Sequence, residues 1–505
     1  MEWPLLSSIL NIILVVFVLL LLRAVFSCWI FPAFAYQKLK RNGLRGPTPR
    51  FPFGNISEMT KKMTSNSSVG VSHDIHSTVF PHFARWQQSY GKVFLYWLGT
   101  EPFLCIADPE FLRKFSAGVV AKNWGKPSVF KKDRMPMFGD GLVMVEGEEW
   151  ARLRHVITPA FAFTKLKPMT SLMVESATKM LDRWSSLINS GNGEIDVERE
   201  IITTAGEIIG KTSFGVSYEN GSEVLKKLSD MQIGLFKYNG NVGVPFRNFI
   251  NPKRNLEAMR LGKEVDTLLL TIVADRKKSG NQHPPKDLLG LLLDANNTLT
   301  SRELIDQCKT FFFGGQETTA LALSWTLLLL AMNPKWQNLL REEIRQVIGD
   351  KEVDYDLLAG LKKMGCVMNE VLRLYPPAPN AQRQTRQDIQ VDDQIVPKGT
   401  NVWIDLVSMH HDPALWGDDV NEFKPERFEK DQLYGGCKNK MGFLPFGFGG
   451  RMCVARHLAM TEYKVVLSLI LSRFSLQLSP TYSHAPGYLL SLRPTYGLPL
   501  KVQPL

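Results

Sequence analysis

The most informative part of this chain is the stretch Phe446-Gly447-Phe448-Gly449-Gly450-Arg451-Met452-Cys453-Val454-Ala455. It places a single cysteine in a glycine-rich loop, just before an apolar segment with the spacing of a helix. Glycine lets backbone N–H groups come close to the sulfur, because no Cβ stands in the way. Hydrogen bonds from such groups, and the N-terminus of a following helix, favour the thiolate form of a cysteine. The loop therefore predicts a stabilised thiolate at Cys453.

Two interpretations of Cys453 are open from the loop alone. A thiolate held in this way suits a single axial bond to a haem iron, where it favours cleavage of an O–O bond. A buried structural cysteine beside a flexible loop is the alternative, and it is the commoner outcome for an arbitrary glycine-rich sequence. The complete pattern Phe-x-x-Gly-x-Arg-x-Cys, from Phe446 to Cys453, favours the haem ligand.

The composition excludes several classes of protein. The 505 residues contain no linker or repeat, which favours one large, mainly helical domain behind an N-terminal segment. Six cysteines without CxxC spacing argue against a disulfide scaffold or a zinc site, and they indicate a reducing compartment. The net charge of +11 is spread along the chain, whereas a nucleic-acid-binding protein more often has a basic stripe interleaved with aromatic residues. We therefore expect no nucleic-acid partner.

One local basic cluster is formed by Lys126, Lys131, Lys132 and Arg134. A cluster of this kind is usually solvated surface, and that is the first interpretation. Contact with anionic lipid or with an acidic redox partner is the second.

The uncharged apolar run from Leu5 to Leu22 predicts a membrane-spanning helix. At ~1.5 Å per residue it would be about 27 Å long, close to the thickness of the hydrocarbon core. Basic residues gather after it, from Lys38 onward, and only Glu2 precedes it, so the positive-inside rule keeps the body of the protein in the cytosol. A cleaved signal peptide is the alternative, but no small-residue cleavage site follows. The sequence Gly46-Pro47-Thr48-Pro49 then predicts a stiff elbow, because proline fixes φ.

A second apolar segment, from Leu304 to Met332, predicts a long helix that ends before Asn333-Pro334. Its middle reads Gly314-Gly315-Gln316-Glu317-Thr318-Thr319. Each glycine lowers helix stability by about 1 kcal/mol relative to alanine, and threonine hydroxyls can bond back to helix carbonyls. An acid and a hydroxyl at such a point suit proton delivery. A kinked helix with a solvent-facing glutamate is the alternative.

Three further patterns involve charged residues. Glu370 and Arg373 have the i, i+3 spacing that puts both on one helical face, although an isolated pair of this kind is more often an exposed one. The sequence Pro425-Glu426-Arg427-Phe428 follows downstream. A Trp-x-x-x-Arg pattern is formed by Trp150 and Arg154.

Taken in this order, over essentially the whole chain, these patterns resemble those of the cytochrome P450 family. They look most like microsomal plant enzymes of the clan that oxidises hormones, terpenoids and fatty acids. The resemblance implies the cytochrome P450 fold, mainly α with a small β region near 91–106 and 385–405. It also implies a membrane anchor and elbow at 1–45 and a single haem-thiolate monooxygenase domain at 46–505. One position departs from the family pattern, because Ala455 stands where glycine is usual.

The resemblance also implies roles for individual residues. Cys453 would be the axial, metal-binding ligand of haem b, and Phe446 would belong to the haem-binding loop. Haem propionates would meet Trp150, Arg154, Arg383 and Arg451. Thr318 would position dioxygen, and Glu317 would relay protons. Arg427 would join Glu370 and Arg373 in a structural cluster that braces the cysteine loop.

The implied activity is monooxygenation of a lipophilic small molecule. The implied partners are NADPH-cytochrome P450 reductase, with cytochrome b5 as an additional candidate, and membrane lipid. The implied location is the endoplasmic reticulum membrane, crossed once, with the catalytic domain facing the cytosol. Substrate contacts would come from the segments 124–144 and 231–249 and from Asn380 and Gln382. A haem-thiolate isomerase or dehydratase is the first alternative, although such relatives commonly lack the Glu-Thr pair. A haem-binding carrier or gas sensor is the second, and it has no need of a proton relay.

Overall fold

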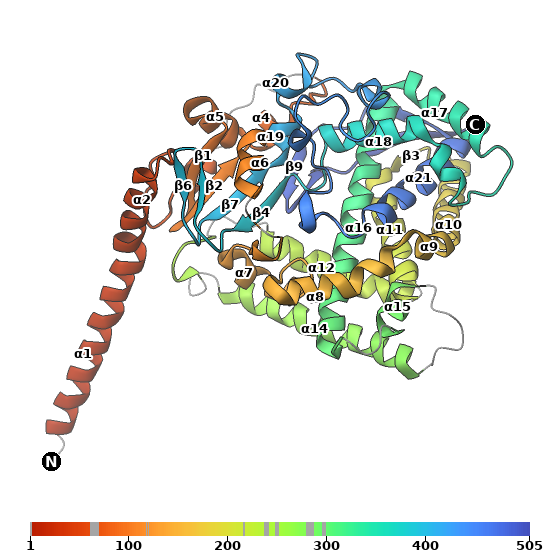
Figure 1. Ribbon diagram of the computed structural model, residues 1–505. Helices are drawn as coiled ribbons and strands as arrows, with labels where there is room; N and C mark the ends of the chain where they lie inside the picture. Colours follow the sequence, from red (N-terminus) through yellow and green to blue (C-terminus); the bar gives the residue numbers. More distant parts are fainter. Residues whose placement is uncertain are drawn as a thin grey trace.

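The computed structural model describes residues 3–60, 70–117, 119, 121–215, 218–236, 242–247, 252–278, 287–294 and 299–505. Figure 1 shows a body of packed helices from which one long helical arm projects at the N-terminus. The arm consists of α1 (Trp3–Val25), a short π-helical turn (Phe26–Ile30) and α2 (Phe31–Arg41).

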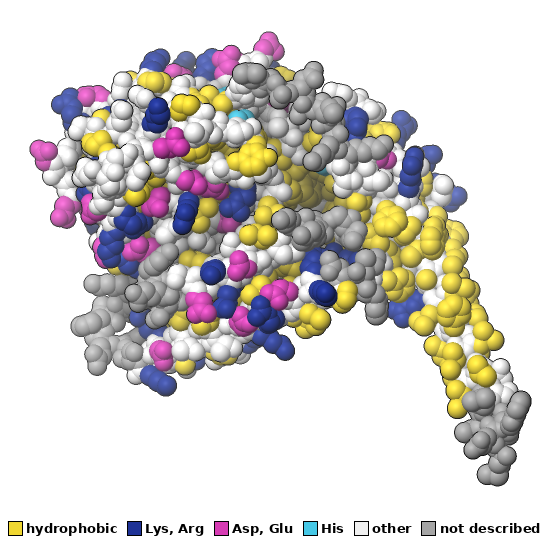
Figure 2. Space-filling view, turned by 180° about the vertical axis from the view of Figure 1, so that it is seen from behind, with side chains coloured by type: hydrophobic (Ala, Val, Ile, Leu, Met, Phe, Trp, Pro, Cys, Tyr) yellow, Lys and Arg dark blue, Asp and Glu magenta, His cyan; other side chains and the backbone are white. Residues whose placement is uncertain are grey.

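The arm is long and apolar enough to cross a membrane. It runs from Ser7 to Arg41 with a mean hydropathy of 2.9 in its most apolar part, none of which is buried. Hydrophobic side chains cover it in Figure 2. The helix predicted for Leu5–Leu22 is therefore present, and it continues to Arg41. Trp29, Phe31 and Phe34 are exposed just beyond the apolar run, at the place where aromatic residues meet a membrane interface.

The segment after the arm lies against the first strand of the body. The Leu95 N–H donates to the Arg45 carbonyl over 2.7 Å. A Cβ on Gly46 would come within 1.8 Å of the Leu95 oxygen, so only glycine permits this approach. The division of the chain at residue 45 stays a prediction.

The body is mainly helical, as expected. Its longer helices are α5 (Pro81–Tyr90), α6 (Pro109–Ala117), α7 (Ser128–Phe138), α8 (Gly147–Ile157), α10 (Thr170–Asn189), α11 (Val197–Phe214), α12 (Tyr218–Phe236), α14 (Pro252–Lys278), α15 (Leu288–Asp294), α16 (Ser301–Met332), α17 (Pro334–Val347), α18 (Lys362–Leu374) and α21 (Arg456–Arg473).

Helix α16 runs through the middle of the body (Figure 1) and confirms the long helix predicted for 304–332. It begins with a capping box, in which Thr300 and Glu303 satisfy each other's backbone N–H groups. Along one side it packs on α11, where the rings of Phe214 and Phe312 stack with centroids 4.0 Å apart. It ends at Met332, before Asn333-Pro334, as predicted.

A small β region accompanies the helices. Strands lie in both predicted stretches, 91–106 and 385–405, and the strands at Glu194–Asp196, at Asn380–Gln384 and between residues 474 and 504 were not predicted. The largest sheet has the order β1-β2-β7-β4, in which β2 and β7 are parallel and the other pairs antiparallel. Its strands are β1 (Val93–Leu98), β2 (Glu101–Ile106), β7 (Asn401–Asp405) and β4 (Asn380–Gln384). The smaller sheets contain β3 (Glu194–Asp196), β5 (Ile389–Val391), β6 (Gln394–Val396), β8 (Phe474–Leu478), β9 (Pro486–Leu489), β10 (Ser491–Pro494) and β11 (Pro499–Pro504).

Candidate active site

The cysteine loop is a tight structure that leads into helix α21. Gly447 and Gly449 have φ of 76° and 59°, so the loop needs glycine at both positions. The Cys453 N–H donates to the Phe446 carbonyl over 2.9 Å, which closes the loop on itself. Helix α21 begins three residues after the cysteine, so its N-terminal N–H groups lie beside the sulfur, as the sequence predicts.

The electrostatics of Cys453 differ from the expectation of a thiolate stabilised by the chain alone. Burial raises the pKa of the Cys453 thiol, and a hydrogen bond from the Ala455 N–H and the charges of Arg154 and Arg456 oppose that rise without cancelling it. Bound metal deprotonates a coordinating thiol outright. The loop therefore presents a sulfur that needs a metal to become a thiolate.

The sulfur opens onto accessible space, although protein surrounds it. Cys453 is exposed, whereas Leu458 in the helix that follows is buried. The middle of α16 is also accessible at one point: Gly314 is exposed, while Phe312 and Thr319 on either side of it are buried. A Cβ on Gly314 would meet nothing within 4 Å. Both places therefore face open space inside a body that is otherwise tightly packed.

Thr318 lies one helical turn after Gly314 and is half-buried. Its hydroxyl donates to the Gly314 carbonyl over 2.7 Å. This is the back-bond expected from the sequence, and it brings the hydroxyl oxygen to the face of α16 on which Gly314 is exposed.

Glu317 is not solvent-facing, so the alternative of an exposed glutamate is wrong. Its side chain is 12% exposed, and its Oε1 accepts hydrogen bonds from Gln232 of α12 over 2.9 Å and from Ser491 of β10. The guanidinium of Arg493 lies 4.0 Å away. The carboxylate therefore joins the middle of α16 to α12 and to the β9–β10 hairpin.

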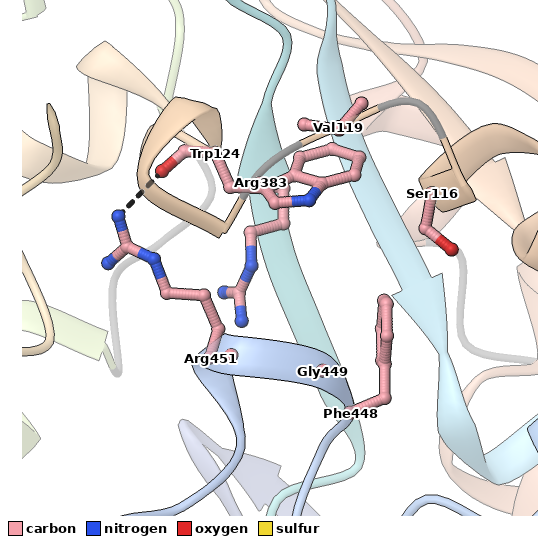
Figure 3. Close-up of a pocket in the computed structure, with 8 residues that line it drawn as sticks. Ser116, Val119, Trp124, Arg383, Phe448, Gly449 and Arg451 are labelled. Carbon is pink, nitrogen blue, oxygen red and sulfur yellow. Dashed lines mark hydrogen bonds between the residues drawn. The ribbon is translucent and has the colours of Figure 1, made fainter. Parts of the chain in front are cut away.

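A pocket lies against the cysteine loop and contains two of the predicted propionate partners, Arg383 and Arg451 (Figure 3). Burial lowers the pKa of Arg383 to about 10, and burial together with the charge of Arg383 lowers that of Arg451 to about 9. Its lining residues are Ser116, Val119, Trp124, Arg383, Phe448, Gly449, Gly450 and Arg451.

Lys126 lies close enough to Arg383 and Arg451 for their charges to affect its pKa. The sequence did not predict this proximity. Burial lowers the pKa of Lys126 well below its usual value, and the charges of Arg383, Arg134 and Arg451 add to the effect. The interpretation of this cluster as solvated surface is wrong for Arg134, which is only 6% exposed, while Lys126 is half-buried. Among the described residues, no carboxylate lies within ion-pair distance of Arg383 or Lys126.

The other predicted partners adjoin the same region in different ways. Arg451 donates to the Trp124 carbonyl (Figure 3) and to the Val145 carbonyl, each over 2.9 Å. Its guanidinium lies 4.2 Å from the ring centre of Trp150. Arg154 donates to the Met452 carbonyl over 2.9 Å, one residue before the cysteine. The structure thus gathers the predicted residues around one loop, and their contacts with a cofactor stay predictions.

The pair Glu370–Arg373 is completely buried, and the atoms nearest each other are 2.7 Å apart. Arg427 approaches Glu370 to 3.5 Å, as the resemblance implies. Arg373 donates to the His410 carbonyl, and His410 Nε2 accepts the N–H of Leu444 over 3.1 Å. Burial lowers the pKa of His410 to about 3, so its ring stays neutral and can accept. This chain of contacts connects the cluster to the segment that enters the cysteine loop.

These residues fit the haem predicted from the sequence. Haem needs an axial ligand that faces open space, which Cys453 provides. It also brings two carboxylates, and buried cations without carboxylate partners suit them, because an uncompensated buried charge is costly. A ring of this size needs room, and a Cβ on Gly314 would meet nothing within 4 Å beside the middle of α16.

Several residues of the site carried no recognisable signal in the sequence. Gln232 and Ser491 reach Glu317 from points 85 and 174 residues away in the chain. For Arg134 a signal existed: it stands four residues after Phe130 and four before Phe138, which puts it on the buried face of α7. Within the segment 231–249, residues 237–241 and 248–249 lie outside the described residues.

Comparisons with known proteins agree with this geometry. Residues 66–497 match the family model described as Cytochrome P450. A cytokinin hydroxylase from Arabidopsis thaliana is 36% identical, with 99% of each chain covered. Cytochrome P450 734A1 from Arabidopsis thaliana is 34% identical over 96% of this chain and 95% of its own. Cytochrome P450 714C2 from Oryza sativa subsp. japonica is also 34% identical, over 94% and 93%. The chain therefore belongs to the cytochrome P450 family, the haem-thiolate monooxygenases whose haem b iron is bound by a cysteine thiolate.

Proposed function

We propose that this chain hydroxylates a lipophilic small molecule of the hormone, terpenoid or fatty-acid type. The relatives support this class, since one at 36% identity over nearly the full length is named a cytokinin hydroxylase. Membership of the family makes the chain a monooxygenase that works with a redox partner. The retained Glu317 and Thr318 favour oxygen chemistry over an isomerase or dehydratase.

The partners and location follow from the arm and the family. We expect the helix from Ser7 to Arg41 to anchor the enzyme in the endoplasmic reticulum membrane. The basic residues Lys38, Lys40 and Arg41 at its end would keep the catalytic domain in the cytosol. Electrons would come from NADPH through the membrane-bound reductase, and cytochrome b5 is a candidate second donor.

The residues around the cysteine loop would hold the cofactor. Cys453 would bind the iron, and Arg383 and Lys126 would meet the propionates, with Arg451, Trp150 and Arg154 fixing the loops on which these groups stand. Bound haem supplies the electron-transfer and oxygen-activating chemistry that no side chain can supply. The cations have a second effect, because each propionate relieves the repulsion between them.

Glu317 and Thr318 would manage protons on the far side of the site. The Thr318 hydroxyl proton is committed to the Gly314 carbonyl, so its oxygen is free to accept a proton donor such as water. The Glu317 carboxylate is held by Gln232 and Ser491. To carry a proton to Thr318 it must leave these partners, so movement of α12 or of the β9–β10 hairpin would regulate the transfer.

The observation that carries this proposal is the pocket against the cysteine loop, which is lined by Arg383 and Arg451, together with the exposure of Cys453 in that loop. The first test is the difference spectrum of the reduced protein with carbon monoxide. We expect the absorption typical of thiolate-ligated haem in the wild type and its loss in Cys453→Ala. A spectrum of the histidine-ligated type in the wild type would overturn the assignment of Cys453.

The second test separates a monooxygenase from a carrier or an isomerase. The full-length enzyme, with reductase in vesicles, should consume NADPH and incorporate one atom of labelled oxygen into product. Thr318→Ala and Glu317→Gln should keep the carbon monoxide spectrum but release more peroxide per product formed. Thr271→Ala is the matched control, because Thr271 makes the same back-bond on exposed α14. Unchanged peroxide release in both variants would refute the relay.

A further inference from the structure

Arg134 is a buried arginine on α7 that the proposed oxygen chemistry does not use. It is 6% exposed, and its guanidinium lies between two aromatic rings, 4.2 Å from the ring centre of Phe130 and 4.9 Å from that of Phe236 on α12. Its Nη1 donates to Gln382 of β4 over 2.9 Å. Its Nε is buried and has no hydrogen-bond partner among the residues that the structure describes.

Among the described residues no carboxylate forms an ion pair with Arg134, and the charge of Asp133 only partly offsets the lowering of its pKa by burial. The adjacent carboxylate, Asp133, is turned to Arg247 and Arg254, and its ion pairs are with those two side chains. The local group of three arginines and one aspartate is therefore already positive before Lys126 is counted. Arginine keeps its charge in a protein interior. Leaving a buried cation without an anion is costly unless another molecule supplies one.

The polar contacts around Arg134 continue toward the site. Gln382 donates to Asn380 over 3.0 Å, and Asn380 donates to the Tyr488 hydroxyl over 3.1 Å. This row joins α7, β4 and β9. Asn380 and Tyr488 are only half-buried although they lie within the core region.

Two of these segments, α7 and β9, also lead to the middle of α16. Phe138, four residues after Arg134, meets Phe313 beside Gly314, with ring centroids 5.3 Å apart. At the end of β9 the Leu489 carbonyl accepts from Gln232, which also holds Glu317. The elements that carry this row therefore reach the middle of α16, by the ring contact of Phe138 and by the hydrogen bonds that join Leu489, Gln232 and Glu317.

From the unpaired guanidinium and the row of polar groups behind it, we infer that the substrate is a lipophilic carboxylic acid whose carboxylate pairs with Arg134. This inference rests on the proposed function and narrows its substrate class. A guanidinium offers two parallel N–H donors to a carboxylate. The rings of Phe130 and Phe236 shield that pair from water, which strengthens it. Gln382 fixes the guanidinium by accepting its hydrogen bond, and Asn380 holds Gln382 in turn, so the acid group is held in one orientation and the apolar body extends toward Thr318.

The test compares acids with their methyl esters, which keep shape and apolar area but lose the charge. The probes are dodecanoic acid and dehydroabietic acid, one flexible and one rigid, each beside its methyl ester. Binding to the full-length holoenzyme is measured by equilibrium dialysis and by the change in haem absorbance. We expect each acid to bind roughly ten- to hundred-fold more tightly than its ester, the ratio conferred by a charge-assisted hydrogen bond. Equal affinity of acid and ester for both skeletons overturns the inference.

Variants separate recognition from a structural role. Arg134→Gln should remove the preference for the acid and leave binding of the ester unchanged, and Arg134→Lys should restore part of it. Lys132→Gln is the matched control, since Lys132 is exposed on the same helix. If Arg134→Gln weakens acid and ester alike, the residue only holds α7 to β4 and the inference is wrong. Failure of the proposed function would be distinguishable, because it would remove the thiolate-type carbon monoxide spectrum or NADPH consumption in the wild type.

Discussion

Two groups of charged residues adjoin the cysteine loop, and they are built in opposite ways. In the Glu370–Arg373 cluster every charge has a partner from the chain: Glu370 also accepts the Lys424 N–H, and Arg373 also donates to backbone carbonyls. In the group around Arg383 and Lys126, the described residues provide no carboxylate at ion-pair distance. The first group is complete without a ligand, and the second is not.

The difference teaches how to separate structure from binding in a buried polar cluster. A paired cluster holds segments of the chain together, and its loss leaves an uncompensated charge. An unpaired cluster destabilises the chain until another molecule brings the opposite charge. Arg134 belongs to the second kind, which is why it points to a substrate rather than to the fold.

The largest expected effect is on the paired cluster. Arg373→Met leaves Glu370 buried with a weakened set of partners, and we expect the free energy of unfolding to fall by about 3–5 kcal/mol. Urea unfolding of the apoprotein, followed by circular dichroism, measures it. The matched control is Arg345→Met, which removes an exposed i, i+3 pair and should change stability by less than about 1 kcal/mol. Equal effects of the two substitutions would break the comparison.

A substitution in the group around Arg383 and Lys126 should change the stability of the apoprotein in the opposite direction. Arg383→Gln removes an uncompensated buried charge, so the apoprotein should become more stable, while haem is lost roughly ten- to hundred-fold faster because one charge-assisted bond is missing. Unfolding of the apoprotein and transfer of haem to an acceptor apoprotein measure the two effects. Arg386→Gln, three residues further along the chain, is the control. Arg386 forms an ion pair with Glu146, so its substitution should not stabilise the apoprotein. A less stable Arg383→Gln apoprotein would contradict the idea of an unpaired site.

The sequence was sufficient to predict features that depend on local periodicity or on the order of motifs along the chain. The helix around Gly314, the strands near 91–106, the N-terminal arm and the pair Glu370–Arg373 all follow from periodicity, spacing and the family pattern. The sequence failed to predict which basic side chains are buried. Lys132 is exposed and Lys126 and Lys131 are half-buried, whereas Arg134 is buried, and the sequence alone does not show which of these basic residues faces the core.

Contacts between distant segments were also beyond the sequence. The partners of Glu317 come from α12 and β10, and neither Gln232 nor Ser491 stands in a motif. The pKa of Cys453 was misjudged for a related reason, because hydrogen bonds can be guessed from a glycine-rich loop but the desolvation that outweighs them depends on the whole fold.

Glu198 is an intermediate case, a buried carboxylate with one shared partner. Arg493 lies 3.4 Å from it and also approaches Glu317. Burial raises the pKa of Glu198 from 4.5 to about 7, with Arg493 opposing the rise and Asp196 adding to it. The folded state then keeps a proton that the unfolded state releases, so stability falls as pH rises from about 4.5 to about 7 and is level above that.

At ~1.4 kcal/mol for each unit of pKa, the whole fall is about 3 kcal/mol. Glu198→Gln should abolish this part of the pH dependence, measured by urea unfolding between pH 5 and pH 8. Glu200→Gln is the control, since Glu200 stands on the same helix and is only half-buried. An unaltered pH profile in Glu198→Gln would show that the Glu198 carboxylate is ionised over this whole pH range and is fully paired, as Glu370 is.

The smallest effect is expected at Ala455, where the family usually has glycine. Ala455 has φ of −97°, which any residue adopts, so glycine is not needed for the backbone. Its N–H donates to the Cys453 sulfur, and Ala455→Gly keeps that donor. Only the methyl group is lost, at the place where the loop passes the cofactor. We expect a change in stability of less than about 1 kcal/mol and a small shift in the reduction potential of the bound iron.

Redox titration of the holoenzyme, the carbon monoxide spectrum and haem retention measure the effect of Ala455→Gly. A small shift in potential with unchanged haem retention means that the methyl group tunes the iron without holding it, and no change in any of the three means that Ala455 acts through its N–H alone. A large loss of haem would contradict the division drawn above. It would show that a neutral contact at the loop, rather than the charges of Arg383 and Lys126, is what fixes the cofactor in this chain.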